Sequence, residues 1–161
     1  MRRPLLFAAC FLALGCIGST AKAAYNNAPY NNTDGSVYIP PGLNDGEIHY
    51  YRLIFVTDTA APGTNSSFGF YDTFVKDRAD LAGSLVQGLT WEAIVSLDDT
   101  QTALSRSSAD GFLVYGTDGT SAGVDYNGLF DTGAGTRNFQ YNQFGQSEGR
   151  VNVWTGSTNT I

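Results

Sequence analysis

Both cysteines of this 161-residue chain lie near its N-terminus, in a segment with the features of an export signal. Two arginines precede an apolar stretch from Leu5 to Ile17. That stretch is shorter than the roughly 20 residues that span a bilayer. Ala21 and Ala23 then supply the small side chains that a signal peptidase reads. We therefore predict a signal peptide over residues 1–23, cleaved after Ala23, with a cut after Ala24 as the second choice.

Removal of this segment constrains the fold that remains. The mature chain would contain no thiol, so it could form no disulfide and no cysteine-based metal site, and apolar packing must hold it together. Two alternatives stay open. Residues 1–23 could form a buried helix of a cytosolic domain, or Cys16 could carry a lipid, because it follows an imperfect lipoprotein box, Ala13-Leu14-Gly15.

The predicted mature chain is strongly acidic. The full sequence has 9 basic and 15 acidic residues, and the signal segment holds Arg2, Arg3 and Lys22. Cleavage after Ala23 leaves 6 basic residues against 15 acidic ones, a formal charge of −9. Such a charge disfavours binding to nucleic acid or to anionic lipid surfaces. We expect no nucleic-acid partner, and we find no membrane-spanning stretch in the mature chain.

Hydrophobic patterning predicts an α+β domain over residues 48–161, after an extended leader over residues 24–47 that is rich in Asn, Tyr, Pro and Gly. The run Leu53–Val56 is apolar on both faces, as in a buried strand. A helix is expected over residues 70–85, with an apolar side made by Phe70, Phe74, Leu81 and Leu85. Strands are expected at residues 37–39, 48–56, 90–96, 112–115 and 151–155, with a turn at 116–119 and long loops elsewhere.

No conventional catalytic set is visible. Gly119-Thr120-Ser121-Ala122-Gly123 matches the nucleophile motif of serine hydrolases, but the chain's single histidine, His49, precedes the serine and no helix pattern follows. One histidine cannot build a zinc site. The adjacent carboxylates Asp98 and Asp99 would face opposite ways on a strand. We therefore predict no enzymatic activity and no cofactor.

A calcium site is an alternative for the glycine-rich region. Oxygen ligands could come from four residues whose spacing does not match the helix-loop-helix calcium loop: Asp118, Asp125, Asn127 and Asp131. Aspartate and asparagine are also common turn formers, which accounts for these residues equally well.

One constellation resembles a ligand site. Phe139, Tyr141 and Phe144 alternate with amide residues that include Asn142. Aromatic rings suit stacking on sugar rings, and amides suit hydrogen bonds to sugar hydroxyls. These four residues are the predicted ligand contacts. The alternative is that the rings fold back onto the core, because aromatic side chains dominate core burial.

Several stretches taken together resemble a known family. They are Tyr38–Gly46 (YIPPGLNDG), Tyr51–Thr57 (YRLIFVT), Tyr71–Val75 (YDTFV), Leu89–Ser96 (LTWEAIVS) and Val153–Ser157 (VWTGS). In their order and spacing, from about Val37 to the end of the chain, they resemble a family of bacterial exported proteins that often end in a PEP-CTERM sorting tail. The domain of that family is similar to the endostatin-like branch of the C-type lectin-like fold.

The resemblance implies a small twisted mixed or antiparallel sheet with one or two helices and long loops, and no established activity. C-type lectins that bind sugar through calcium use Glu-Pro-Asn or Gln-Pro-Asp with Trp-Asn-Asp, and neither motif occurs here. Calcium-dependent sugar binding is therefore not implied. The family pattern continues with a further strand and the sorting tail, so we expect a domain that is incomplete at its C-terminal end.

These observations together favour a non-enzymatic exported protein with a structural or interaction role at the cell surface or in the extracellular matrix. The expected location is secreted or at the outer cell surface after Sec-type export. An extracellular polysaccharide or a matrix protein would be its partner. The alternative is a calcium-independent carbohydrate-binding module that uses the aromatic and amide loops. A hydrolase would need residues that the sequence does not supply.

Overall fold

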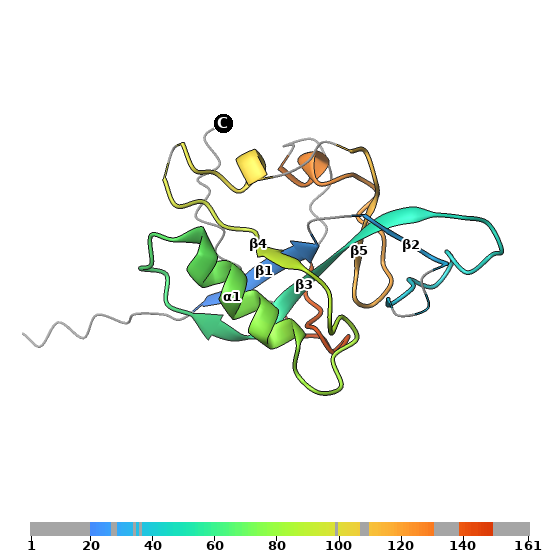
Figure 1. The fold of residues 1–161 in the computed structure, drawn as a ribbon, viewed down its shortest axis with the longest axis horizontal. Coiled ribbons are helices and arrows are strands. Elements are labelled where there is room, and N and C mark those ends of the chain that lie inside the picture. The colour runs from blue at the N-terminus through green and yellow to red at the C-terminus, as the bar shows by residue number, and fades with distance from the viewer. Residues whose placement is uncertain are drawn as a thin grey trace, which may run out of the picture.

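The computed structural model describes residues 20–26, 29–33, 35, 37–98, 100–106, 110–130 and 139–149. Within these ranges one α-helix packs beside a mixed sheet, which confirms the predicted α+β class (Figure 1). The predicted strand at 151–155 lies outside the described residues. The elements in chain order are β1 (Thr20–Asn26), β2 (Tyr30–Asn31), β3 (Tyr50–Ala61), α1 (Phe68–Ala79), β4 (Trp91–Ala93), the 3₁₀ turn η1 (Leu104–Arg106), β5 (Val114–Gly116) and the 3₁₀ turn η2 (Asn127–Phe130).

The strand order is β2-β3-β1-β4, and β5 pairs with β3. β1 is antiparallel to both of its neighbours, with Ala24 opposite Phe55 of β3 and Ala93 of β4. β5 runs parallel to β3, with Val114 opposite Arg52. Residues 24–47, predicted as a leader outside the domain, thus contribute part of β1, all of β2 and the buried Val37. The short strand predicted at 37–39 is not formed.

β3 is the longest strand and separates two apolar clusters. Tyr51, Leu53 and Phe55 point to the cluster that includes α1, whereas Ile54 belongs to the second cluster with Val114. This alternation follows from the two-residue period of a strand, and it confirms the prediction of a strand buried on both faces. The strand continues past the predicted end at residue 56, because Ala60 and Ala61 pair with the first residues of β1.

The helix differs from its prediction in length and in buried face. α1 ends at Ala79, so Leu81 and Leu85 follow it in a turn segment. Its buried side chains are Tyr71, Val75 and Ala79, which are spaced four residues apart on one face. The Tyr71 hydroxyl accepts from the backbone N–H of Asn65 at 3.1 Å, so an aromatic with a polar tip occupies the core position. The predicted face is wrong because Phe70 is 37% exposed and Leu85 41%.

Three arginines hold the elements together through aspartates. Arg78 of α1 donates to both oxygens of Asp58 on β3, at 2.8 and 2.6 Å. Arg106 of η1 donates to both oxygens of Asp72 on α1, at 2.9 and 2.8 Å. Arg52 of β3 is 1% exposed and pairs with Asp110. Arg78 and Arg106 therefore each join two separate elements.

These pairs predict acid sensitivity. Burial is the largest single effect on the pKa of Asp58 and of Asp110 and would raise both. The hydrogen bonds and charge of Arg78 and Arg52, with further contributions from the Gln143 side chain at Asp58 and from the Phe112 N–H at Asp110, together outweigh it and lower both pKa values. A carboxylate with a lowered folded pKa stabilises the fold above its unfolded pKa, about 3.9, and this stability is lost as the pH falls through the folded pKa. We expect a constant melting temperature from neutral pH down to about pH 5 and a fall below about pH 4. Circular dichroism melts over a pH series would show this, and a higher melting temperature at about pH 3 than at pH 7 would contradict it.

Candidate functional site

The turn after β5 brings polar groups to one edge of the second apolar cluster. Gly116 N–H donates to Thr120 O and Gly119 N–H to Gly116 O, both at 2.9 Å, which confirms the predicted turn at 116–119. The Asp118 carboxylate accepts from the Thr120 N–H at 3.0 Å and from the Thr120 hydroxyl at 2.6 Å. The pKa of the Tyr38 phenol is raised, mainly by burial and secondly by the negative charge of Asp118. The turn thus holds the Asp118 carboxylate in a fixed place.

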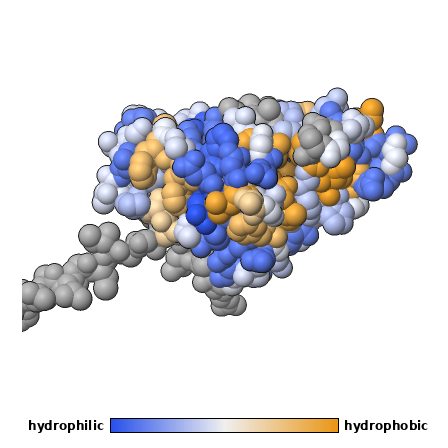
Figure 2. All heavy atoms as spheres, turned by 60° about the horizontal axis from the view of Figure 1, so that its bottom comes forward, coloured by the Kyte–Doolittle hydropathy of each residue, from blue (hydrophilic) through white to orange (hydrophobic). Residues whose placement is uncertain are grey.

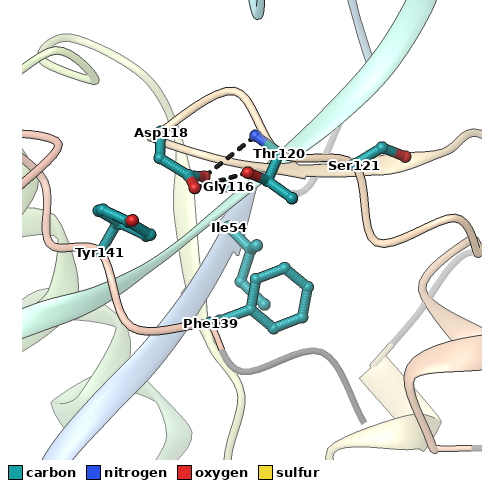
Figure 3. Close-up of a pocket in the computed structure, with 7 residues that line it drawn as sticks. All are labelled: Ile54, Gly116, Asp118, Thr120, Ser121, Phe139 and Tyr141. Atoms are coloured by element: carbon teal, nitrogen blue, oxygen red, sulfur yellow. Dashed lines mark hydrogen bonds between the residues drawn. The ribbon is translucent and has the colours of Figure 1, made fainter. Parts of the chain in front are cut away.

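A pocket of about 40 Å³ opens beside this turn (Figure 3). The Asp118 pocket, as we name it, has room for a few water molecules and is far below the roughly 300 Å³ at which pockets enclose drug-sized ligands. It can therefore take one small group of a larger ligand, not the ligand as a whole. Its lining residues come from β3, from the 116–121 turn and from the loop at 139–141: Ile54, Gly116, Asp118, Thr120, Ser121, Phe139 and Tyr141.

The pocket has a polar end and an apolar end. Figure 3 shows Asp118 and Thr120 on one side of it and the Phe139 ring beside Ile54 on the other, with the Tyr141 ring flanking Asp118. The Tyr141 backbone is fixed, because its carbonyl accepts from the Val56 N–H of β3 at 3.0 Å. A carboxylate beside two aromatic rings can accept hydrogen bonds from hydroxyls while the rings contact C–H groups.

Two of the four predicted ligand residues line this pocket, and two do not. Phe139 and Tyr141 are at the pocket, whereas Asn142 and Phe144 are absent from its lining. Asn142 is 2% exposed, and its side-chain oxygen accepts from the N–H groups of Phe144 at 2.9 Å and Gln146 at 3.0 Å. The Asn142 amide thus shapes the 142–146 turn and does not line this pocket, so its role as a ligand contact stays a prediction.

Two further pocket residues were considered in the sequence as candidates for metal binding or catalysis. Asp118 was a calcium candidate and Ser121 a nucleophile candidate, and both line the Asp118 pocket. Ile54, Gly116 and Thr120 carry no signal in the sequence, because only the pairing of β5 with β3 brings them together. A periodicity argument cannot find contacts that depend on which strands pair.

The serine of the hydrolase motif and the single histidine each have a local contact in the structure. The Ser121 hydroxyl accepts from the Gly123 N–H at 3.0 Å. His49 Nε2 lies 2.9 Å from Asp45 Oδ1, and His49 is not among the residues lining the Asp118 pocket. Ser121 thus contacts the backbone of its own turn, and His49 contacts Asp45.

The calcium candidates are also dispersed. Asp125 accepts from the Gly128 N–H at 2.9 Å in a turn of its own, and Asp131 lies outside the described residues. Within the described part of the chain, no three His, Cys, Asp or Glu side chains group closely enough to hold a metal ion. Among the same residues, no helix combines the length and apolar character needed to cross a bilayer.

Gly119, which follows Asp118 in the turn, has a backbone conformation and a close neighbour that favour glycine. Its φ of 83° is in the left-handed region, and a Cβ there would lie 2.3 Å from Pro41 Cδ. We expect Gly119→Ala to lower the free energy of unfolding by about 2 kcal/mol, because both the backbone and Pro41 must shift. Urea unfolding would measure this. Gly46→Ala is the matched control for the backbone term, since Gly46 has a φ of 94° but open space around the new Cβ. Equal losses for the two variants would contradict the role of the Pro41 contact.

Comparison with known proteins adds no relative: no family model, no curated protein and no solved structure matches this chain.

Proposed function

We propose that this chain is an exported, non-catalytic interaction protein of the cell surface or extracellular matrix that contacts a polysaccharide at the Asp118 pocket. The observation that carries the proposal is the meeting of Phe139 and Tyr141 with the Asp118 carboxylate around one small opening. Export is supported by the N-terminal charge, apolar stretch and small residues. A non-catalytic role is supported by the order of the motif in the sequence, because His49 precedes Ser121, and by the contact that His49 makes with Asp45.

The chemistry of the pocket suits a sugar edge. A carboxylate offers about four acceptor positions, and Thr120 occupies two of those on Asp118, which leaves acceptors for ligand hydroxyls. The aromatic rings supply flat apolar faces for the C–H side of a sugar ring. Because the opening is small, a single contact would be weak, with a Kd on the order of 1 mM, and many contacts along a polymer would raise the apparent affinity.

The finer fold that we propose is the endostatin-like branch of the C-type lectin-like fold. Support comes from the packing of the single described helix, α1, on one face of a small mixed sheet, and from the irregular segments after β4. The resemblance of the Trp91 segment and its neighbours points the same way. A crystal structure of the exported protein tests this directly, and a sheet with a different strand order would contradict it.

Binding to insoluble polysaccharides tests the function. We expect the protein to co-sediment with at least one extracellular polysaccharide, and Tyr141→Ala to weaken that binding about tenfold, which corresponds to about 1.4 kcal/mol. Tyr50→Ala is the matched control, because Tyr50 is 54% exposed and does not line the pocket. Retention on none of a broad panel, or equal binding by the wild type and Tyr141→Ala, would contradict the proposal.

A protein partner is the second candidate, and exposed apolar side chains favour it. Figure 2 shows apolar surface interspersed with polar surface over one face of the molecule. Ile48, Tyr50 and Leu113 are exposed, and the Tyr50 ring lies 5.6 Å from that of Phe112. If a matrix protein is the partner, Tyr50→Ala would weaken its binding and Tyr141→Ala would not, so the same pair of variants separates the two candidates.

A further inference from the structure

The first strand crosses the position predicted for signal-peptide cleavage. β1 begins at Thr20, and a cut after Ala23 falls in its middle. The residues on the N-terminal side of that cut pair with the end of β3, Thr20 with Ala61 and Ala23 with Val56. Cleavage after Ala23 would remove these pairs and leave Ala24 to Asn26 as the whole strand.

That remnant would have to hold the sheet together. In the strand order β2-β3-β1-β4, β1 is the link between β3 and β4. β4 carries the buried Trp91, which is opposite Asn26 of β1. The hydrogen-bonded link of β4 to β3 therefore depends on how firmly β1 is paired with β3, and most of that pairing lies at and before Ala24.

A cut after Ala23 would also create a charge in an unfavourable place. The new α-ammonium group would belong to Ala24, which is 0% exposed and packs in the cluster around Phe55. A charged group placed beside an apolar cluster is unfavourable, because it loses part of its hydration. The second choice, a cut after Ala24, removes the buried alanine itself and shortens the strand further.

We infer that the exported protein keeps the whole of β1, and that the leader is cut before Thr20, after Gly18. Cys16 and Gly18 are small residues at the two positions that a signal peptidase reads, and they directly follow the apolar stretch. Lys22 would then stay in the mature chain, giving 7 basic against 15 acidic residues and a formal charge of −8. This inference rests on the export that we propose as part of the function.

The test is the N-terminus of the exported protein. The full chain is produced in a bacterium with Sec export, and the protein outside the cytoplasm is analysed by intact mass and N-terminal sequencing. We expect a start at Ser19. A start at Ala24 or Tyr25 would overturn the inference while leaving export intact. An uncut chain that stays in the cytoplasm would instead overturn the export proposal. A start at Cys16 with the added mass of a lipid would overturn the cut after Gly18, although the exported protein would still keep the whole of β1.

Two matched variants locate the cut independently of whether each variant folds, because signal cleavage acts on the unfolded chain during export. A large residue just before the cut blocks cleavage. We expect Gly18→Leu to raise the fraction of uncut precursor at least fivefold and Ala23→Leu to leave it unchanged. The reverse pattern, accumulation with Ala23→Leu alone, would place the cut inside β1 and refute the inference.

Discussion

Replacing Trp91 with alanine is expected to lower the free energy of unfolding by about 4 kcal/mol. The Trp91 side chain is buried, and its ring meets that of Phe55 edge-on at a centroid distance of 4.7 Å. Its indole N–H donates to Val86 O at 3.2 Å. The change removes the largest ring between β4 and β3, and the surrounding cluster can refill only part of the space. Denaturant unfolding measures the loss.

The Trp91→Phe variant distinguishes the contribution of the aromatic ring from that of the indole hydrogen bond. Phenylalanine keeps an aromatic contact with Phe55 but gives the Val86 carbonyl no donor, so we expect a loss of about 1 to 2 kcal/mol. A Trp91→Ala variant that loses under about 1 kcal/mol would show that β4 is not anchored as described.

Asp110→Ala is expected to cost about 3 kcal/mol, which is the second largest effect. Arg52 lies almost fully buried on β3, where Asp110 supplies the negative charge beside its guanidinium. Arg52 Nε donates to Asp110 Oδ2 at 3.0 Å. Removing the carboxylate takes this negative charge away from a buried guanidinium, which costs more than the pair itself stabilises. In a domain of this size the loss corresponds to a fall in melting temperature of about 6 to 12 °C.

Two controls show whether the buried charge is the cause. Lys76→Met breaks the Lys76–Asp80 pair on the surface of α1, where both side chains are well exposed, and should change stability by less than about 1 kcal/mol. Adding Arg52→Met to Asp110→Ala removes the buried positive charge and should restore part of the loss. If the double variant is less stable than Asp110→Ala alone, the burial of charge is not the reason for the effect.

The sequence predicts those parts of the fold in which local pattern and packing agree. The run Leu53–Val56 has no polar residue, which predicts a strand whose two faces are both buried, and all four residues are buried in the structure. The α1 face is mispredicted because the core buries Tyr71 and Val75 fully, whereas Phe74 is only partly buried and Phe70 is exposed. Tyr71 looks polar in a pattern, yet its hydroxyl reaches backbone groups at the edge of the core.

β1 was missed for a different reason. Its residues carry the composition of a leader's end, and short alanine-rich segments give no strand signal by themselves. They become a strand because β3 and β4 offer edges on both sides. Local propensity cannot anticipate pairing between segments that are distant along the chain.

The candidate site also combines residues that local sequence indicates with residues that only the tertiary fold brings together. Aromatic residues among amides indicated a loop that could contact a ligand, and Phe139 and Tyr141 do line the Asp118 pocket. Asn142 belongs to the same local pattern, but its side-chain oxygen accepts hydrogen bonds from the backbone of the 142–146 turn. Asp118 and Ser121 reach the same opening through the tertiary position of the turn after β5, which spacing along the chain does not encode.

An NMR titration tests the central claim most directly, because it reports both whether a sugar binds and where. The ¹⁵N-labelled exported protein is titrated with soluble oligosaccharides derived from whichever polysaccharide retains it. The largest amide shifts are expected at Gly116, Thr120 and Tyr141, with saturation at millimolar concentration on the order of the weak single-site Kd. Shifts confined to residues away from the Asp118 pocket, or no shifts at saturating sugar, would contradict the account.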